Sequence, residues 1–107
     1  MFKIPLKRPR LVRVCENSML PTYKDGDILF VLPVRFSKIK EGDVLIFYRK
    51  EAERVLIKRV TIKSNHTKKL FFEGDNPEVS HDSRHFGFVD AECVLGKVYP
   101  QRKKGEC

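Results

Sequence analysis

Hydrophobic and polar residues alternate along much of this chain with the two-residue period of a β-strand. The pattern predicts six strands, within the segments RLVRVC (10–15), DILFVLPV (27–34), DVLIFYR (43–49), RVLIKRVTIK (54–63), KKLFFEGD (68–75) and CVLGKVYP (93–100). Apolar residues nowhere keep a helical spacing, although residues 19–24 suit one short helical turn. We therefore expect an all-β fold, a coiled antiparallel sheet or partial barrel with at most short helical turns.

The turns between these strands are marked by Gly-Asp pairs. Such pairs occur at Gly26-Asp27, Gly42-Asp43 and Gly74-Asp75, each beside an apolar segment. Glycine permits positive φ angles, and an aspartate side chain can accept hydrogen bonds from nearby main-chain N–H groups. The tetrapeptide KEAE (50–53) is expected to connect two neighbouring strands as a hairpin.

The strand at 54–63 carries a lysine on an otherwise apolar face. Side chains at every second position share a face of a strand. One face is expected to hold Leu56, Lys58, Val60 and Ile62, and the opposite, water-facing one to hold Val55, Ile57, Arg59, Thr61 and Lys63. In one interpretation the stem of Lys58 covers apolar surface while its ammonium group reaches water. In the other the amine is desolvated, so its pKa falls and it can act as a base near neutral pH.

Ser18 stands in the segment ENSMLPTYKDGD (16–27), before a bend and without a histidine nearby in the sequence. A serine at such a place usually caps a turn by hydrogen bonding to local backbone. It becomes a nucleophile only beside a base, and a neutral lysine can serve as that base. Ser18 and Lys58 together therefore suggest a serine–lysine pair of the kind that some hydrolases use.

Four segments in the same order resemble the conserved boxes of the signal peptidase I family. They span about three quarters of the chain, from Ser18 to Lys97. The segments are SMLPT (18–22) followed by GD (26–27), EGDVLIF (41–47), IKRV (57–60), and GDNPEVSHDSRHFGFV (74–89) followed by VLGKV (94–98). The resemblance implies the fold of signal peptidases and LexA-type peptidases, and it implies a serine endopeptidase.

The resemblance also implies a role for several individual residues. Ser18 corresponds to the nucleophile and Lys58 to the general base, and the main-chain N–H of Ser18 would form part of the oxyanion hole. Asn17 is a second candidate donor to the oxyanion. Ser80 corresponds to a serine that hydrogen-bonds and orients the lysine. Residues that would support the site are Met19 and Pro21 at the bend, Asp75 and Asn76 at a turn, and Asp82 and Arg84 as an ion pair.

The chain departs from the family pattern in three ways. Export enzymes carry a transmembrane anchor before the serine box, whereas seventeen residues precede Ser18. Fifteen residues separate Arg59 from Asp75, so the large β-insertion of bacterial export enzymes is missing. Glu16 occupies a position that is often serine or glycine, and its negative charge is unsuited to stabilising an oxyanion.

A compact, anchorless chain of this length most resembles the maturation proteases of nickel-type superoxide dismutase. The expected partner is then a precursor protein with a short N-terminal leader, such as that dismutase. Two alternatives remain open. One is signal peptidase I-type removal of export signals beside a separately anchored partner, and the other is a non-catalytic basic binding module on the same fold.

The length of 107 residues suits one domain. We expect a single peptidase domain over 1–107, with a basic N-terminal arm at 1–10 and a basic C-terminal tail at 101–107. No run of 18 or more apolar residues occurs, and the cationic start lacks the apolar region of a secretory signal. We therefore expect no transmembrane segment and a cytoplasmic location.

Other candidate chemistry in the chain is weak. The cysteines Cys15, Cys93 and Cys107 are odd in number and far apart, so no disulfide is expected and Cys15 should be a buried strand residue. His81 and His85 lack a third metal ligand, so we expect neither metal nor cofactor. The net charge of +8, much of it at the two ends, is compatible with a nucleic acid or a membrane surface as partner. Binding of single-stranded nucleic acid would need aromatic residues interleaved on a basic face, and Phe71 and Phe72 beside Lys68 and Lys69 are the only such cluster, so we expect no nucleic-acid partner and leave peripheral membrane contact open.

Overall fold

The computed structural model describes residues 8–106 and consists mainly of one antiparallel sheet. Most of the basic arm expected at 1–10, and Cys107, lie outside the described residues. The strands are β1 (Arg10–Arg13), β2 (Ile28–Leu32), β3 (Val44–Arg49), β4 (Arg54–Ser64), β5 (Lys69–Glu73), β6 (Val89–Asp90) and β7 (Val94–Tyr99). The short helices are η1 (Phe36–Lys38), α1 (Ser83–Phe86) and η2 (Ala91–Cys93).

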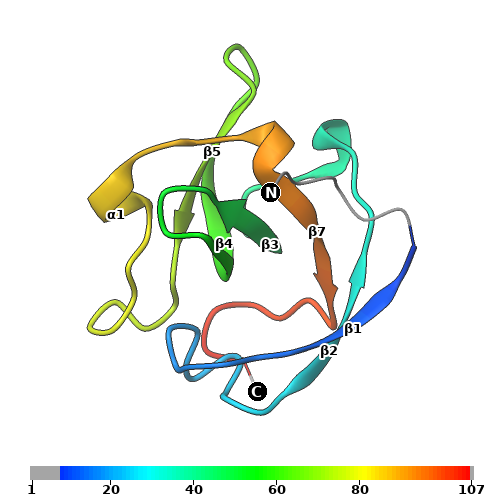
Figure 1. Ribbon diagram of the computed structural model, residues 1–107, viewed down its shortest axis with the longest axis vertical. Helices are drawn as coiled ribbons and strands as arrows, with labels where there is room; N and C mark the ends of the chain where they lie inside the picture. The colour runs from blue at the N-terminus through cyan, green and yellow to red at the C-terminus, as the bar shows by residue number, and fades with distance from the viewer. Residues whose placement is uncertain (1–7, 107) are drawn as a thin grey trace.

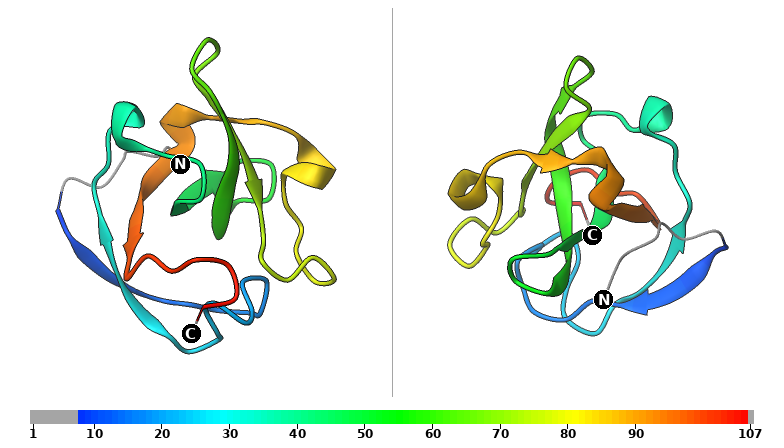
Figure 2. Two further views of the ribbon diagram at one scale, coloured as in Figure 1. Left: turned by 180° about the vertical axis from the view of Figure 1, so that it is seen from behind. Right: turned by 45° about the horizontal axis from the view of Figure 1, so that its top comes forward.

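The seven strands follow the order β1-β2-β7-β3-β4-β5-β6, so the sheet is open between β1 and β6. The sheet curls strongly, and the end that carries β1 and β2 swings around toward the β3–β4 hairpin (Figures 1 and 2). This architecture confirms the all-β prediction and its coiled antiparallel sheet. The count of six strands was wrong, because the two-residue strand β6 is too short for any alternation to reveal.

Strand β3 lies at the centre of the sheet and is buried on both faces. Val44 and Ile46 pack into one hydrophobic cluster, together with the core residues Met19 and Tyr23. The alternate residues Leu45 and Phe47 pack into the second cluster, where the ring of Phe47 stacks on that of Phe72 at 4.0 Å. Burial on both faces explains why β3 is a continuous apolar run in the sequence.

Strand β4 does not keep strict alternation, because its register against β5 shifts between Val60 and Ile62. Beyond this bulge Ile62 is 45% exposed, whereas Arg59 on the supposed water-facing side is only 8% exposed. The expected division of the strand into an apolar and a solvated face is therefore wrong at these two positions. A bulge adds one residue to one strand only, so Ile62, which lies beyond it, changes face. Arg59 lies before the bulge and is buried because it forms an ion pair with Asp75.

Cys15 follows the end of β1 and is exposed, which corrects the expectation of a buried strand cysteine. Strand β1 ends at Arg13, and the next residue, Val14, is the one that enters the core.

Within residues 8–106, none of the helices has the length and apolar character needed to cross a membrane.

Candidate active site

Ser18 lies in the loop between β1 and β2, at the start of one tight helical turn. The main-chain N–H of Tyr23 donates to the carbonyl oxygen of Met19 over 3.0 Å, which closes this turn. The side chains of Met19 and Tyr23 are 1% and 0% exposed and pack into the core. The turn expected at 19–24 is present, and its buried side chains hold Ser18 at a fixed place beside the sheet.

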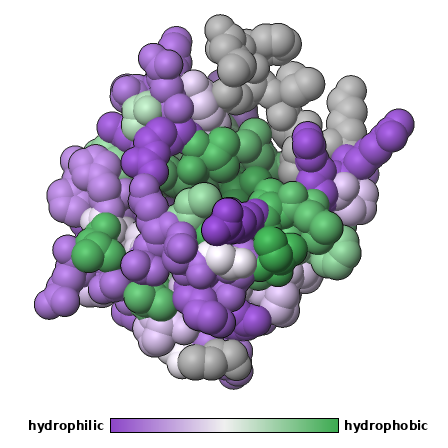
Figure 3. Space-filling model, turned by 60° about the horizontal axis from the view of Figure 1, so that its bottom comes forward, coloured by the Kyte–Doolittle hydropathy of each residue, from purple (hydrophilic) through white to green (hydrophobic). Residues whose placement is uncertain are grey.

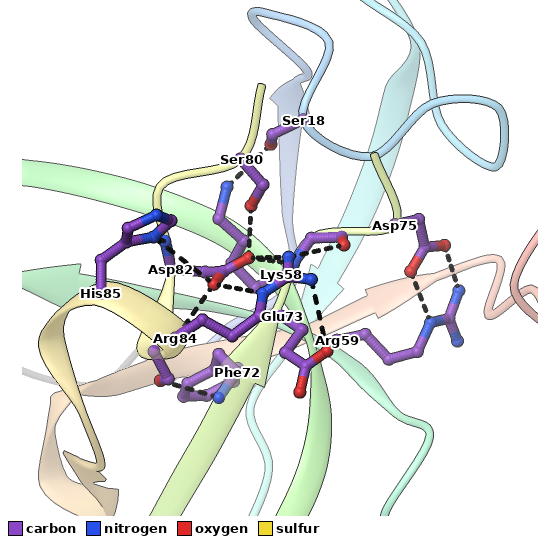
Figure 4. Close-up of polar contacts among 12 residues, drawn as sticks. Ser18, Lys58, Arg59, Phe72, Glu73, Asp75, Ser80, Asp82, Arg84 and His85 are labelled. Carbon is purple, nitrogen blue, oxygen red and sulfur yellow. Dashed lines mark hydrogen bonds and ion pairs between the residues drawn. The ribbon is translucent and has the colours of Figure 1, made fainter. Parts of the chain in front are cut away.

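Lys58 comes from β4 and meets Ser18 although forty positions separate the two residues. The Nζ atom of Lys58 donates to Oγ of Ser18 over 2.8 Å (Figure 4). Lys58 is 3% exposed and Ser18 is 8% exposed. Burial removes the ammonium group from water and lowers the pKa of Lys58 from 10.5 to about 8, although the nearby carboxylates of Asp82 and Glu16 oppose this shift. The structure thus brings together the two residues of the predicted pair, and it excludes the interpretation in which the lysine reaches open water.

Asp82 lies behind the pair as a fully buried carboxylate. It accepts hydrogen bonds from the Ser80 hydroxyl at 2.6 Å, the Gly74 main-chain N–H at 2.8 Å and Nε of Arg84 at 2.9 Å. Burial alone would raise the pKa of the Asp82 carboxyl, but these bonds together hold it well below its usual value. The carboxylate also caps α1 by accepting from the main-chain N–H of Arg84.

The structure places the predicted residues Ser80, Asp82 and Arg84 in one network, with a difference at Ser80. Its hydroxyl donates to Asp82, and within residues 8–106 no hydrogen bond joins Ser80 to Lys58. Ser80 therefore lies between the carboxylate and the pair (Figure 4). A β-carbon at position 74 would collide with the Ser80 side chain and lie 2.7 Å from the Ser18 carbonyl oxygen, so only glycine fits there.

A second buried ion pair, between Arg59 and Asp75, supports the serine turn through Thr22. The sequence analysis did not predict this pair. Arg59 binds Asp75 with two parallel bonds of 2.9 and 2.7 Å, and the same carboxylate accepts from the Thr22 hydroxyl at 2.6 Å. Nη1 of Arg59 also donates to the carbonyl oxygens of Gly42 and Arg102. The available signal was an arginine inside a long strand together with an aspartate in a Gly-Asp turn.

The neighbouring turn holds the backbone around the nucleophile. The main-chain N–H of Asn76 donates to the Ser18 carbonyl at 2.9 Å, and its side-chain amide donates to the Asn17 carbonyl at 3.0 Å. The main-chain N–H of Asp75 points at Sδ of Met19 over 3.4 Å. Asp75 and Asn76 were expected only to shape the turn in which they lie. They also hold the serine turn in place through these direct contacts. Pro21 follows a cis peptide bond within the serine turn.

The oxyanion donors suggested by the sequence are placed as follows. In the part of the chain that the structure describes, the main-chain N–H of Ser18 donates no hydrogen bond to another protein group. Asn17 is exposed, beside the nucleophile. The carboxylate of Glu16 is turned toward Arg54, whose Nη2 it binds at 2.6 Å.

A cleft of about 420 Å³ opens beside Ser18 and Lys58, between β1 and the first half of β4. Its apolar lining includes Val12, Val14, Ile46, Leu56, Ile57 and Leu95. Figure 3 shows apolar surface gathered in a hollow on this side of the molecule, with hydrophilic side chains around it. Strand β4 pairs with β5 only from Arg59 onward, and β1 pairs with β2 alone among the described residues. Both walls of the cleft therefore present free strand edges.

The two histidines near Asp82 take part in packing. The rings of His81 and His85 stack with centroids 4.9 Å apart. Nδ1 of His85 accepts from the main-chain N–H of Asp82 at 3.4 Å and completes the cap of α1. Within the described range 8–106, His, Cys, Asp and Glu residues form no group of three that could hold a metal ion.

Comparison with known proteins adds one finding to this geometry. No curated protein matches the chain significantly. A family model described as Peptidase S24-like matches residues 6–99, which include the serine turn, β4 and the Asp82 network. That family supports a serine peptidase-type function in general, and some of its members are non-catalytic. The match covers most of the chain, and on this evidence the chain belongs to the Peptidase S24-like family.

Proposed function

We propose that this chain is a serine endopeptidase in which Ser18 is the nucleophile and Lys58 the general base. The observation that carries the proposal is the 2.8 Å contact between Nζ and Oγ in a site where burial lowers the lysine pKa to about 8. A lysine with its ordinary pKa is almost fully protonated at neutral pH, whereas one with a pKa near 8 is neutral in a useful fraction of molecules.

The proposed reaction follows from these positions. Neutral Lys58 removes the proton from Ser18, and Oγ attacks the carbonyl carbon of the scissile bond. The negative charge that develops on the carbonyl oxygen accepts a hydrogen bond from the main-chain N–H of Ser18. The Lys58 ammonium then donates its proton to the departing amine, which leaves an acyl enzyme. A water molecule, deprotonated by Lys58, hydrolyses this ester and restores the hydroxyl.

The cleft suits a substrate in extended conformation. The free edges of β1 and of residues 54–58 in β4 offer main-chain hydrogen bonds on both sides of an inserted strand. The apolar lining contributed by Val14, Ile46 and Leu95 favours small apolar side chains near the scissile bond. A substrate segment bound in this way would be an unfolded one, such as a chain terminus.

The reaction that we propose is removal of an N-terminal leader from a precursor, in particular maturation of nickel-type superoxide dismutase in the cytoplasm. The sequence resemblance to small, anchorless maturation proteases supports this substrate. The test is co-expression of the chain with a nickel superoxide dismutase precursor, followed by mass spectrometry of the product N-terminus. We expect a single new N-terminus with the intact chain and none with Ser18→Ala.

Two other results of that experiment would each indicate an alternative function. Cleavage of an export signal peptide instead, only in the presence of an anchored partner, would indicate the signal peptidase activity. Binding without cleavage of any precursor, weakened by salt, would indicate a non-catalytic basic module.

The pH dependence of cleavage follows from the lysine pKa. Only the neutral amine can accept the proton of Ser18, so kcat/KM should rise about tenfold per pH unit below pH 8 and level off above it. The measurement is kcat/KM on one leader peptide between pH 5.5 and about 9.5. A profile that is flat across pH 6–8 would contradict the role of Lys58 as base.

A further inference from the structure

An ion pair joins the two walls of the cleft beside the nucleophile. Nη2 of Arg54, at the start of β4, lies 2.6 Å from the carboxylate of Glu16, two residues before Ser18. Both residues line the cleft together with Ser18 and Lys58. Their charges reach the reactive amine, since Glu16 raises and Arg54 lowers the pKa of Lys58. The pair is therefore close enough to the catalytic pair to contact a bound substrate.

The pair is exposed, whereas its backbone is held in place. The side chains of Arg54 and Glu16 are 54% and 61% exposed, and exposed pairs of this kind contribute little net stability. Glu16 has a φ of 80° and its main-chain N–H donates to Oδ1 of Asp25 at 2.8 Å. A carboxylate from another molecule can thus replace that of Glu16 on Arg54 at small cost, without any movement of the main chain.

The cleft has an excess of positive charge. Apart from Lys58, its charged lining residues in the described chain are Arg10, Arg13, Arg54 and Glu16. Arg10 pairs with the buried Val31 of β2 and so shares the inward side of β1. Arg13 instead pairs with the exposed Ile28, so its side chain lies on the outer side of β1. One carboxylate is thus set against the two guanidinium groups of Arg10 and Arg54, and guanidinium binds a carboxylate through a planar fork of donors. A negatively charged side chain in the substrate is favoured here, and a positively charged one is disfavoured.

We propose that the cleft selects substrates with an aspartate or glutamate within about four residues of the scissile bond, and that Arg54 binds this carboxylate in place of Glu16. The inference rests on the proposed function and adds the class of substrate. The spacing follows from the strand, since Arg54 and Lys58 are four residues and roughly 13 Å apart on one side of β4. A substrate extended along β4 has the same rise per residue.

The test uses labelled ten-residue peptides of alanine and valine in which one position is Asp, Asn or Lys. The position is moved along the peptide, and binding to the Ser18→Ala chain is measured by fluorescence anisotropy at low salt. We expect the Asp peptide to bind about fivefold more tightly than the Asn peptide at one or two neighbouring positions, and the Lys peptide to bind most weakly. Added salt should reduce these differences.

Two charge variants and one matched control complete the experiment. Arg54→Glu should reverse the order of the three peptides, and Glu16→Gln should strengthen the preference for Asp because it removes the competing carboxylate. Lys69→Glu alters another exposed pair, with Asp90 and away from the cleft, and should leave the order unchanged. Equal affinities of the three peptides at every position, or the original order in Arg54→Glu, would overturn the inference. Binding does not need cleavage, so failure of the leader assay alone would overturn only the proposed reaction.

Discussion

Replacing Lys58 with methionine is expected to abolish cleavage and, at neutral pH, to make the folded chain more stable. Methionine keeps much of the apolar stem but cannot accept the proton of Ser18, so kcat/KM should fall by about a thousandfold or more. The gain in stability arises because the folded state holds the lysine in a buried site that disfavours its charge. A pKa lowered from 10.5 to about 8 corresponds to a penalty of about 3 kcal/mol in the free energy of unfolding.

Because the pKa of Lys58 is lower in the folded state than in the unfolded state, the stability penalty that it causes depends on pH. Below pH 8 the amine is charged in both states, so the full penalty acts on the native protein. Between pH 8 and 10.5 the native amine is neutral while the unfolded one still binds a proton, so stability rises with pH as the penalty disappears. The loss of the hydrogen bond to Ser18 offsets about 1 kcal/mol of the gain. Lys58→Met should therefore be about 2 kcal/mol more stable than the original chain at pH 7 and lose this advantage toward pH 10.

Urea unfolding at pH 7 and at pH 10 measures both parts of this prediction. Lys50→Met, in the exposed turn between β3 and β4, is the matched control and should change stability by less than about 0.5 kcal/mol at either pH. A Lys58→Met chain that is less stable than the original at pH 7, or that retains measurable cleavage, would contradict a buried lysine acting as the base.

Replacing Asp75 with asparagine removes a single negative charge and is expected to cause a large loss in the free energy of unfolding. Asp75 and Arg59 are 5% and 8% exposed, so removal of the carboxylate leaves a buried guanidinium without its bidentate partner. Such a loss costs about 3–5 kcal/mol, a large part of the stability of a chain of this size. The Thr22 hydroxyl also loses its charged acceptor, so the serine turn should loosen and cleavage should decline with it.

Thermal and urea unfolding of Asp75→Asn test this expectation. Asp90→Asn is the control, because Asp90 pairs with Lys69 at an exposed site where the change should stay below about 1 kcal/mol. The double replacement Arg59→Met with Asp75→Leu removes both charges and should recover most of the loss. Equal stability of Asp75→Asn and Asp90→Asn would show that the buried pair does not brace the serine turn.

The strands were predictable because half-buried strands carry an apolar residue at every second position, and strands buried on both faces are short continuous apolar runs. All six predicted strands have approximately the positions that the pattern predicts, and they correspond to β1, β2, β3, β4, β5 and β7. The bulge in β4 was not predictable, since neither Val60 nor Ile62 differs in kind from an ordinary strand residue. The burial of Arg59, which precedes the bulge, was not predictable either, since it depends on Asp75, a partner that lies sixteen residues further along.

The candidate site divides in the same way. Ser18 and Lys58 were identified from a box pattern and from a lysine on an apolar face, both of which are local features of the sequence. That Arg59 binds Asp75 and that Glu16 pairs with Arg54 depend on distances between separate segments. Ser80 and Asp82 are only two residues apart, but the choice of Asp82 rather than Lys58 as the partner of Ser80 depends on the folded arrangement. Local spacing carries no information about which of several nearby polar groups a side chain reaches.

The sequence by itself determined the strand class of this protein, the turns between strands and the two residues of the candidate pair. The strand class and the turns follow from short-range sterics and from burial of alternate residues, which each segment records in its own composition. The candidate pair was identified through the resemblance to the signal peptidase I boxes, together with the lysine on an apolar face. Only the tertiary structure decided that Lys58 is buried away from water, because the serine turn and the residues around Asp82 must cover its Nζ atom together. The curl of the sheet that brings β1 opposite β4 likewise belongs to the assembled chain, since it sums the twist and packing of all the strands.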